Sequence, residues 1–247
     1  MKLVSMNIEG KKHLARVIPF LRREKPDAVC LHEVFQKDAA NIGKILGMRR
    51  FFVAMTLVRG EKRGIAIFSH FPMKKKGIVY YYKAARTLQE HNLNNKRATI
   101  HQALLAVEVG AGDKKFILGN THFTWTPNGM SDDNQRKDIK ELFRVLKKFP
   151  EIILCGDFNI PRGVNDLYGE ITKRYRDAVP KSYVSSLNMR LHRMGKNKKE
   201  SRRMKKFMVD YIFLSKEYRA TSVRLASGIS DHKAVIGFID KKKDCVV

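Results

Sequence analysis

Residues 151–159 read EIILCGDFN, an apolar run that ends in an acid and an amide. A short run rich in isoleucine and leucine is typical of a strand buried on both faces, and we expect one over residues 151–158. Asp157 and Asn159 fall where this strand ends. Because α/β proteins place ligand sites at the carboxyl ends of such strands, both side chains are candidates for a functional site.

The same arrangement recurs along the chain, with polar side chains at the ends of other apolar runs. They are Asn7 and Glu9 after KLVSM, Glu33 after AVCLH, His122 after FILGNT, Asp210 in FMVDYIF, and Asp231 with His232 just before KAVIGF. A single acid or histidine of this kind is most often a surface residue or a satisfied polar group of the core. Their repeated placement at strand edges indicates instead a shared site.

These candidates agree in their chemistry. Carboxylates combined with an asparagine suit a hard, oxygen-seeking cation, Mg²⁺ or Mn²⁺. The sequence has no cysteines or paired histidines at the spacing of zinc ligands, which argues against zinc. Two histidines and several acids also supply what phosphoryl transfer needs besides a metal, namely activation of water, neutralisation of developing charge and in-line positioning.

Outward from these motifs, short strand patterns alternate with helical ones. Strands are expected at 2–8, 28–34, 51–58, 64–70, 77–82, 102–109, 115–123, 151–158, 208–214 and 233–239, with a weaker pattern at 220–226. Helices are expected at 13–25, 36–47, 131–148 and, more weakly, 164–175. We expect 51–58, 64–70 and 77–82 to be antiparallel neighbours. With no repeat or linker, the pattern predicts one sheet-rich α/β domain over residues 1–247, with helices outside.

The charge of the chain points to its partner. The 247 residues include 50 Lys and Arg against 24 Asp and Glu, a formal net charge of +26. This charge implies a polyanionic partner, nucleic acid in the first place and an anionic membrane surface in the second. The alternative is a generally basic, solvated surface.

The cysteines and the N-terminus predict the compartment. Cys30 and Cys155 lie in apolar runs and Cys245 lies in the tail, which favours a reducing compartment without a disulfide framework. The N-terminus has no apolar signal region, and no stretch approaches the length of a membrane span. We expect a cytoplasmic protein without a transmembrane segment, and a monomer by default.

Residues 181–206 form a basic segment that contains Arg202 and Arg203. The segment lacks sustained apolar periodicity and joins two predicted strands. One interpretation is a solvated, mobile loop. The other, which its place in the chain favours, is a loop that contacts phosphates near the site.

Taken in order, the motifs MNIEG, LHEV, NTHF, GDFN, VDYIF and SDH resemble those of the endonuclease/exonuclease/phosphatase superfamily. That family includes pancreatic deoxyribonuclease, abasic-site endonucleases, tyrosyl-DNA phosphodiesterases, deadenylases and neutral sphingomyelinases. The resemblance extends from residue 2 to residue 240. It implies an α/β (α+β) four-layer sandwich of the deoxyribonuclease I-like type, in which two packed mixed β-sheets are flanked by helices.

The resemblance also implies a metal site. Glu33 would be the principal ligand of Mg²⁺, or alternatively of Mn²⁺, with help from Asn7, Glu9 and Asp231. His32 stands before this glutamate, where relatives often have glutamine. Because neighbours on a strand point to opposite faces, we expect His32 to point away from the site.

The catalytic roles follow from the same resemblance. Asp157 would orient or deprotonate the attacking water, and Asn159 would hold a phosphate oxygen. His122 and His232 would flank the phosphate and donate to its oxygens. Asp210 would accept a hydrogen bond from His232 and fix its tautomer. The identity of the general base stays open.

The expected phosphate contacts depart from the family. Gln102 occupies a position where many relatives have an arginine, so Arg97 or the 190–206 loop, with Arg202 and Arg203, would supply the positive charge. Trp125 follows His122 closely in the sequence. It would either stack on a base or sugar or pack beneath the loop.

The leading hypothesis is a divalent-metal-dependent phosphodiesterase, a hydrolase of nuclease or DNA-repair type that acts on DNA or RNA. An alternative is a phosphatase or phospholipid phosphodiesterase acting on inositol phosphates or sphingomyelin-like substrates, since one fold hosts many substrates. A further alternative is a catalytically inactive, basic nucleic-acid-binding module. The sequence does not separate DNA from RNA, or internal cleavage from cleavage at an end.

Overall fold

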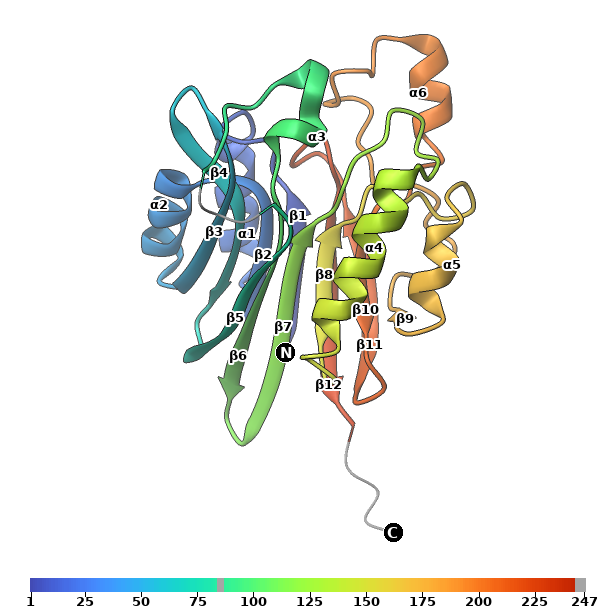
Figure 1. Cartoon of the computed structure of the whole chain (residues 1–247). Helices are drawn as coiled ribbons and strands as arrows, with labels where there is room; N and C mark the ends of the chain where they lie inside the picture. The colour runs from blue at the N-terminus through green and yellow to red at the C-terminus, as the bar shows by residue number, and fades with distance from the viewer. Residues whose placement is uncertain (84–86, 243–247) are drawn as a thin grey trace.

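The computed structural model describes residues 1–83 and 87–242. Two mixed, six-stranded sheets lie face to face, and helices cover their outer faces (Figure 1). This arrangement confirms the predicted α/β sandwich. No helix of the described segments is long and apolar enough to cross a membrane.

The first sheet has the strand order β11–β12–β1–β2–β4–β3. Its strands are β1 (Lys2–Asn7), β2 (Ala28–Phe35), β3 (Arg49–Val58), β4 (Glu61–Ser69), β11 (Tyr218–Ala226) and β12 (Ala234–Lys241). Strands β1 and β2 are parallel, and the other neighbours are antiparallel.

The second sheet has the strand order β5–β6–β7–β8–β10–β9. Its strands are β5 (Met73–Tyr82), β6 (Gln102–Ala111), β7 (Lys114–His122), β8 (Ile153–Asp157), β9 (Arg176–Asp177) and β10 (Asp210–Leu214). Strands β7 and β8 are parallel, so each sheet contains a parallel pair near its centre.

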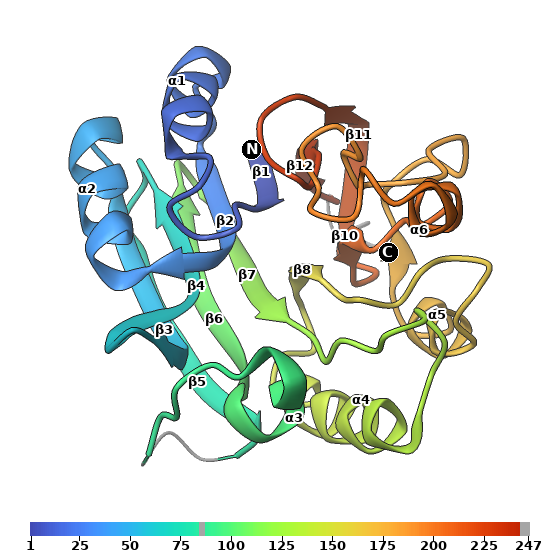
Figure 2. The same cartoon turned by 90° about the horizontal axis from the view of Figure 1, so that it is seen from above.

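Helices α1 (Leu14–Glu24), α2 (Gln36–Leu46), α4 (Asp133–Leu146) and α5 (Leu167–Thr172) form the outer layers, as Figure 2 shows. Helices α1 and α2 cover the first sheet, and α4 and α5 cover the second. A 3-10 turn (Leu93–Asn95), α3 (Lys96–Thr99) and α6 (Lys198–Met204) lie at the upper end of the molecule in Figure 1.

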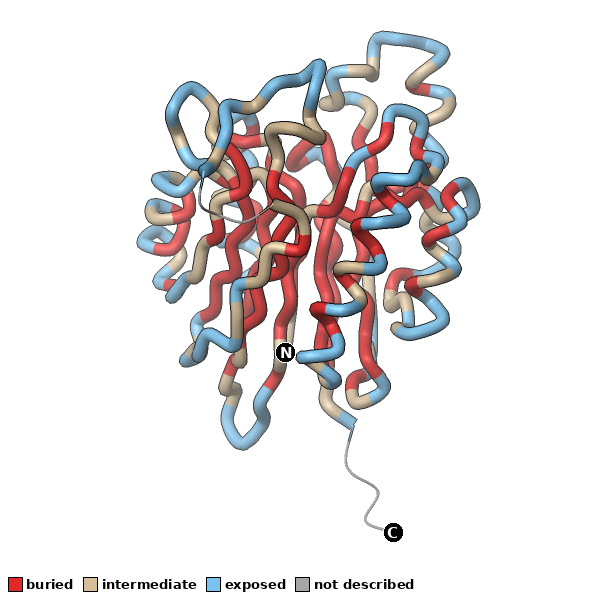
Figure 3. The backbone as a smooth tube through the Cα atoms, viewed as in Figure 1, coloured by how far each residue is buried: buried red, intermediate tan, exposed pale blue. Residues whose placement is uncertain are grey.

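The main core lies between the sheets, and the alternation of strand residues explains it. Leu3 of β1 belongs to the same cluster as Leu105 and Leu154 of the second sheet, whereas its neighbour Val4 packs with Val17 of α1. Successive strand residues point to opposite faces. A continuous apolar run therefore fills both the inter-sheet core and the core under the helices, and the central strands are buried along most of their length (Figure 3).

Strand register gathers the polar side chains at one edge. In the first sheet, Asn7 at the end of β1 lies opposite His32 of β2. In the second sheet, Asp157 at the end of β8 lies between His122 of β7 and Asp210 of β10. Residues far apart in the sequence therefore meet where the two sheets face each other.

Two expectations about the elements are wrong. Residues 51–58 and 64–70 are antiparallel neighbours in the first sheet, but 77–82 belongs to β5, which pairs with β6 in the second sheet. The connection after β4 therefore crosses from one sheet to the other, which local patterns do not reveal. The basic segment 181–206 is not a loop throughout, because α6 lies within it, with Asn197 capping the helix through a hydrogen bond to Glu200 N–H.

Candidate active site

The carboxylate of Asp157 lies at the centre of the polar edge. Its Oδ2 accepts a hydrogen bond from Asn7 Nδ2 at 3.1 Å. The Nε2 atoms of His122 and His232 lie 3.6 and 3.8 Å from the same oxygen. Asp157 is only 2% exposed. Both sheets thus converge on one buried carboxylate oxygen.

Asn7 holds two acids in place. Its Oδ1 accepts the backbone N–H of Glu9 at 3.1 Å, which turns the amide nitrogen toward the acids. That nitrogen lies 3.3 Å from Glu33 Oε1 and also donates to Asp157. In this arrangement Asn7 bridges Glu33 and Asp157 through its NH₂ group and orients both.

Glu33 reaches the site because the strand is irregular there. The register of β2 shifts between His32 and Val34, and Glu33 has a left-handed backbone with φ 56°. Arg63 Nη1 donates to Glu33 Oε2 at 3.1 Å. Burial acts to raise the pKa of Glu33, but Arg63, His122 and Asn7 outweigh it and lower the pKa to about 2. Glu33 is therefore a carboxylate throughout the neutral range.

The expectation that His32 points away from the site is wrong, because of the same irregularity in β2. This ring does not point away from the site, because it is buried between the sheets and its Nε2 lies 2.8 Å from Asn120 Oδ1. The Asn120 nitrogen already donates to the carbonyls of Leu31 and Ala66, so His32 Nε2 carries the proton. Burial, followed by the proximity of His122, lowers the pKa of His32 to about 3.

His232 and Asp210 form a close pair. His232 Nδ1 lies 2.7 Å from Asp210 Oδ2, and both residues are buried. Burial acts to lower the pKa of His232, but Asp210, Asp157 and Asp231 outweigh it and raise the pKa well above its usual value. His232 is thus held as an imidazolium, with Nδ1 donating to Asp210 and Nε2 directed at Asp157.

Asn159 is fixed beside this group. Its backbone has φ 53°, and its N–H donates to Asp157 Oδ1 at 3.1 Å. Its side-chain nitrogen donates to the carbonyl of Phe123 at 2.9 Å. Asn159 therefore ties the end of β8 to the segment that follows His122.

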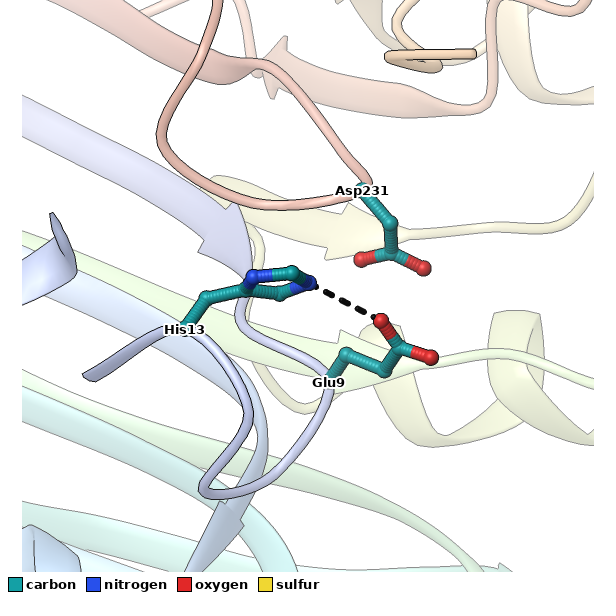
Figure 4. A group of neighbouring side chains, drawn as sticks. All are labelled: Glu9, His13 and Asp231. Atoms are coloured by element: carbon teal, nitrogen blue, oxygen red, sulfur yellow. Dashed lines mark hydrogen bonds and ion pairs between the residues drawn. The ribbon is translucent and has the colours of Figure 1, made fainter. Parts of the chain in front are cut away.

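Two of the predicted metal residues lie in a second, adjoining cluster. Glu9 Oε2 lies 3.0 Å from His13 Nε2. The ligand atoms of Glu9, His13 and Asp231 all lie within 4.8 Å of one another (Figure 4). Burial, then the neighbouring carboxylates of Glu9 and Glu33, raise the pKa of Asp231 against the opposing effect of His232. The three carboxylates of Glu9, Glu33 and Asp231 are thus close enough to influence one another.

A cleft of about 790 Å³ opens above these clusters, and basic and aromatic side chains form its rim. Lys96 Nζ lies 3.7 Å from the centre of the Trp125 ring, which is 42% exposed. Burial, then the nearby Arg193, lower the pKa of Lys96 to about 8. The rim thus presents a flat aromatic surface beside positive charge.

The structure separates the residues predicted to contact phosphate. Arg97 lines the cleft, but its guanidinium forms a double hydrogen bond with Asp138 and lies over the Tyr82 ring. Gln102 lines the cleft and is buried. Two further predicted contacts, Arg203 and Arg202, lie on α6.

The two arginines of α6 differ in position. Arg203 lines the cleft and donates to Asn128 and the carbonyl of Pro127, which anchors α6 to the loop after β7. Arg202 is exposed and lies outside the lining of the cleft.

The comparisons with known proteins identify the family. The model of the endonuclease/exonuclease/phosphatase family matches residues 4–232. The chain belongs to this family. Members of the family are hydrolases that act on phosphodiester or phosphate bonds. No curated protein matches the chain in sequence.

Solved structures show the same fold at low sequence identity. A family protein from Leptotrichia buccalis is 16% identical, with 97% of this chain and 99% of that chain covered and a TM-score of 0.74. The human Nocturnin catalytic domain with a bound sulfate anion is 15% identical, with 98% and 93% covered and a TM-score of 0.67. A humanized D. rerio TDP2 is 16% identical, with 98% and 99% covered and a TM-score of 0.68.

Three residues of the site, His13, Arg63 and Lys96, lie outside the family motifs, and they were not predicted from the sequence. His13 was assigned only to the start of a helix, although its spacing of four from Glu9 brings acid and imidazole together across one turn. Arg63 precedes the apolar run GIAIFS, and Lys96 lies in a polar stretch. Neither has a local signal that connects it to the site, because strand pairing and the chain reversal before β6 bring them there.

Proposed function

We propose that the chain is a divalent-metal-dependent phosphodiesterase that hydrolyses DNA or RNA. The observation that carries the proposal is the buried Asp157 carboxylate, held by Asn7 and flanked by His122 and His232, at the base of a basic cleft. An acid that is fixed by an amide and open on one side to two imidazoles is suited to orienting a water molecule for attack on phosphorus.

Each neighbour of Asp157 has a role in this reaction. Asp157 takes a proton from the attacking water. The His232 imidazolium, which Asp210 holds charged, donates from Nε2 to a phosphate oxygen as negative charge builds. His122 donates to a second oxygen, and Asn159 keeps Asp157 in position through its backbone N–H.

The donor set fits a hard divalent cation. Glu33, Glu9 and Asp231 line the same cleft, and burial, with the neighbouring carboxylates, raises the pKa of Asp231. These three residues would hold Mg²⁺ or Mn²⁺. When bound, the cation neutralises charge on the phosphate oxygens.

The rim supports a nucleic-acid substrate. A net charge of +26 favours a polyanion, and Lys96 and Arg193 place part of this charge at the cleft. Trp125 is 42% exposed, and a base can stack on its ring once Lys96 moves off that face. Together these features favour a single-stranded or unpaired segment at the entrance of the cleft.

The test is a metal-dependence assay on a labelled panel. The panel contains single- and double-stranded DNA, RNA, an abasic-site duplex, a 5′-tyrosyl oligonucleotide and an inositol phosphate, each with Mg²⁺, Mn²⁺ or chelator. Asp157→Asn keeps the size of the side chain, and we expect it to slow turnover by roughly 10²–10⁴-fold. Asp113→Asn, in the exposed turn between β6 and β7, is the matched control.

The outcomes separate the alternatives. Cleavage of a nucleic acid that disappears with chelator and with Asp157→Asn supports the proposal and names the substrate. If only the inositol phosphate were turned over, the substrate would be a small phosphoester and not a nucleic acid. Binding of nucleic acid without turnover of any substrate would overturn the assignment as an enzyme for these classes.

A further inference from the structure

His13 lies outside every family motif, yet it faces the predicted metal residues. The turn after β1 reverses the chain so that Glu9 and His13 meet at the start of α1, with 3.0 Å between Glu9 Oε2 and His13 Nε2. The imidazole is only 4% exposed. A histidine buried against a carboxylate at the edge of a polar cluster is placed to act on that cluster.

Asp231 completes the group from the opposite side of the site. Figure 4 shows its carboxylate, on the loop before β12, directed toward Glu9 and His13. Asp231 is 7% exposed, and its Oδ1 accepts the Ser230 hydroxyl at 2.9 Å. Its Oδ2 accepts no hydrogen bond, and no lysine or arginine pairs with it, within the described parts of the chain. One carboxylate oxygen of this mostly buried residue is therefore without a hydrogen bond on the side of the cluster.

The spacing of the Glu9 and His13 ligand atoms equals that of neighbouring cation ligands, and Asp231 lies near both. Two ligands bound at right angles, each about 2.1 Å from a first-row metal ion, lie about 3.0 Å apart. The Glu9 and His13 ligand atoms are 3.0 Å apart, and all three ligand atoms lie within 4.8 Å of one another. Lys12 Nζ contacts both carboxylate oxygens of Glu9 at 3.0 and 2.9 Å, and a cation bound there would displace this exposed side chain.

We propose that His13 is a ligand of a divalent cation, together with Glu9 and Asp231, and that it determines which cation the site prefers. An imidazole nitrogen among carboxylates favours a first-row transition ion over Mg²⁺, which prefers oxygen ligands. The site therefore selects Mn²⁺ over Mg²⁺. The inference rests on the metal dependence proposed above, but it concerns binding and is measured without hydrolysis.

The experiment follows Mn²⁺ binding to the full chain by electron paramagnetic resonance, with Mg²⁺ as competitor. His13→Gln removes the ring nitrogen at similar length, and His70→Gln, at an exposed histidine beyond the far end of β4, is the matched control. We expect His13→Gln to weaken Mn²⁺ binding by roughly tenfold to a hundredfold, to leave Mg²⁺ binding within about twofold, and to reduce the ¹⁴N modulation of bound Mn²⁺. His70→Gln should change none of these.

Each result decides the matter. Unchanged Mn²⁺ affinity and unchanged ¹⁴N modulation in a folded His13→Gln protein would overturn the proposal and leave His13 as a hydrogen-bond partner of Glu9. If His13→Gln does not fold, Asp231→Asn serves instead, because it keeps the shape of the residue. It must weaken Mn²⁺ binding while the Mn²⁺ that still binds keeps the ¹⁴N modulation from His13, and unchanged affinity or absent modulation would overturn the proposal. A protein that binds Mn²⁺ through His13 but cleaves no nucleic acid would refute the proposed function and leave this site intact.

Discussion

The base of the cleft and its rim are built in different ways. The base consists of side chains at strand ends, namely Asn7, Glu33, His122, Asp157, Asp210 and His232. Most of them are buried, and they hold one another through hydrogen bonds. The rim consists of Lys96, Trp125, Arg193 and Arg203, which stand on short helices and loops and are at least partly exposed, and Arg202 lies outside it on α6.

The difference has a physical origin. Strand register fixes the base, because His122, Asp157 and Asp210 are ladder partners on adjacent strands. No ladder fixes the rim, where short helices such as α3 are anchored by a few side-chain contacts. We therefore expect substitutions in the base to lower kcat for every substrate. Substitutions in the rim should change KM, by amounts that vary with the substrate.

After Asp157→Asn, the largest effect is expected at Asp210, a fully buried member of the base. Asp210→Asn removes the largest of the effects that raise the pKa of His232, so this pKa should fall, although Asp157 and Asp231 still raise it. A raised pKa keeps the imidazolium charged below that pKa and loses it as the pH rises. The variant should lose roughly 10²-fold in kcat, and its activity should decline at a lower pH than that of the wild type.

Titration of the His232 ring by NMR, alongside the pH profile of kcat, measures both effects. Asp113→Asn serves as the control for a lost surface carboxylate. If His232 titrated identically in Asp210→Asn, the pair would be structural, and the base would not act as one electrostatic unit.

The same difference explains what the sequence could predict. The motif residues were predicted because polar side chains that end buried strands meet at one edge of a sheet. In the structure, strand register places His122 and Asp210 on either side of Asp157. The sheet to which β5 belongs could not be predicted, because a non-local pairing with β6 decides it. The predicted orientation of His32 was wrong, because the alternation of side chains between the two faces of β2 fails at Glu33, where the strand is irregular.

The rim was harder to predict for a related reason. Helices α3 and α6 are too short to show a hydrophobic period, and both begin with an asparagine cap whose side chain accepts a backbone N–H. Arg97 was a reasonable candidate from its charge, but its bond to Asp138 of α4 depends on tertiary structure. The number of Lys and Arg residues predicts that the rim is basic. The contacts in the folded protein decide which of these side chains remain available to bind phosphate.

A smaller effect, limited to binding, is expected at Lys96 of the rim. Its pKa is lowered to about 8, so the ammonium is charged below that pH and is lost as the pH rises through it. Affinity for a labelled single strand should fall by at most about tenfold between about pH 7 and pH 9 if only the charged form binds phosphate. Lys96→Met should start weaker and show no such decline.

Lys96→Arg provides the control, because a guanidinium stays charged through this range. The measurement is the dissociation constant in chelator, where turnover is absent. A wild-type decline that persists unchanged in Lys96→Met would assign the titration to another group.

The smallest effect is expected at Arg202, which is exposed on α6 outside the cleft. A phosphate contact made there adds affinity without regard to sequence or chemistry. Arg202→Ala should therefore reduce the slope of log Kd against log salt concentration by about 1 and leave kcat unchanged. Lys115→Ala removes the same charge beside the turn between β6 and β7, at the opposite end of the molecule from α6 (Figure 1). If both variants reduced the slope equally, the positive charge would act as a diffuse field over the whole surface. If only Arg202→Ala did so, the nucleic acid would extend from the cleft across α6 and would follow a defined path over the surface.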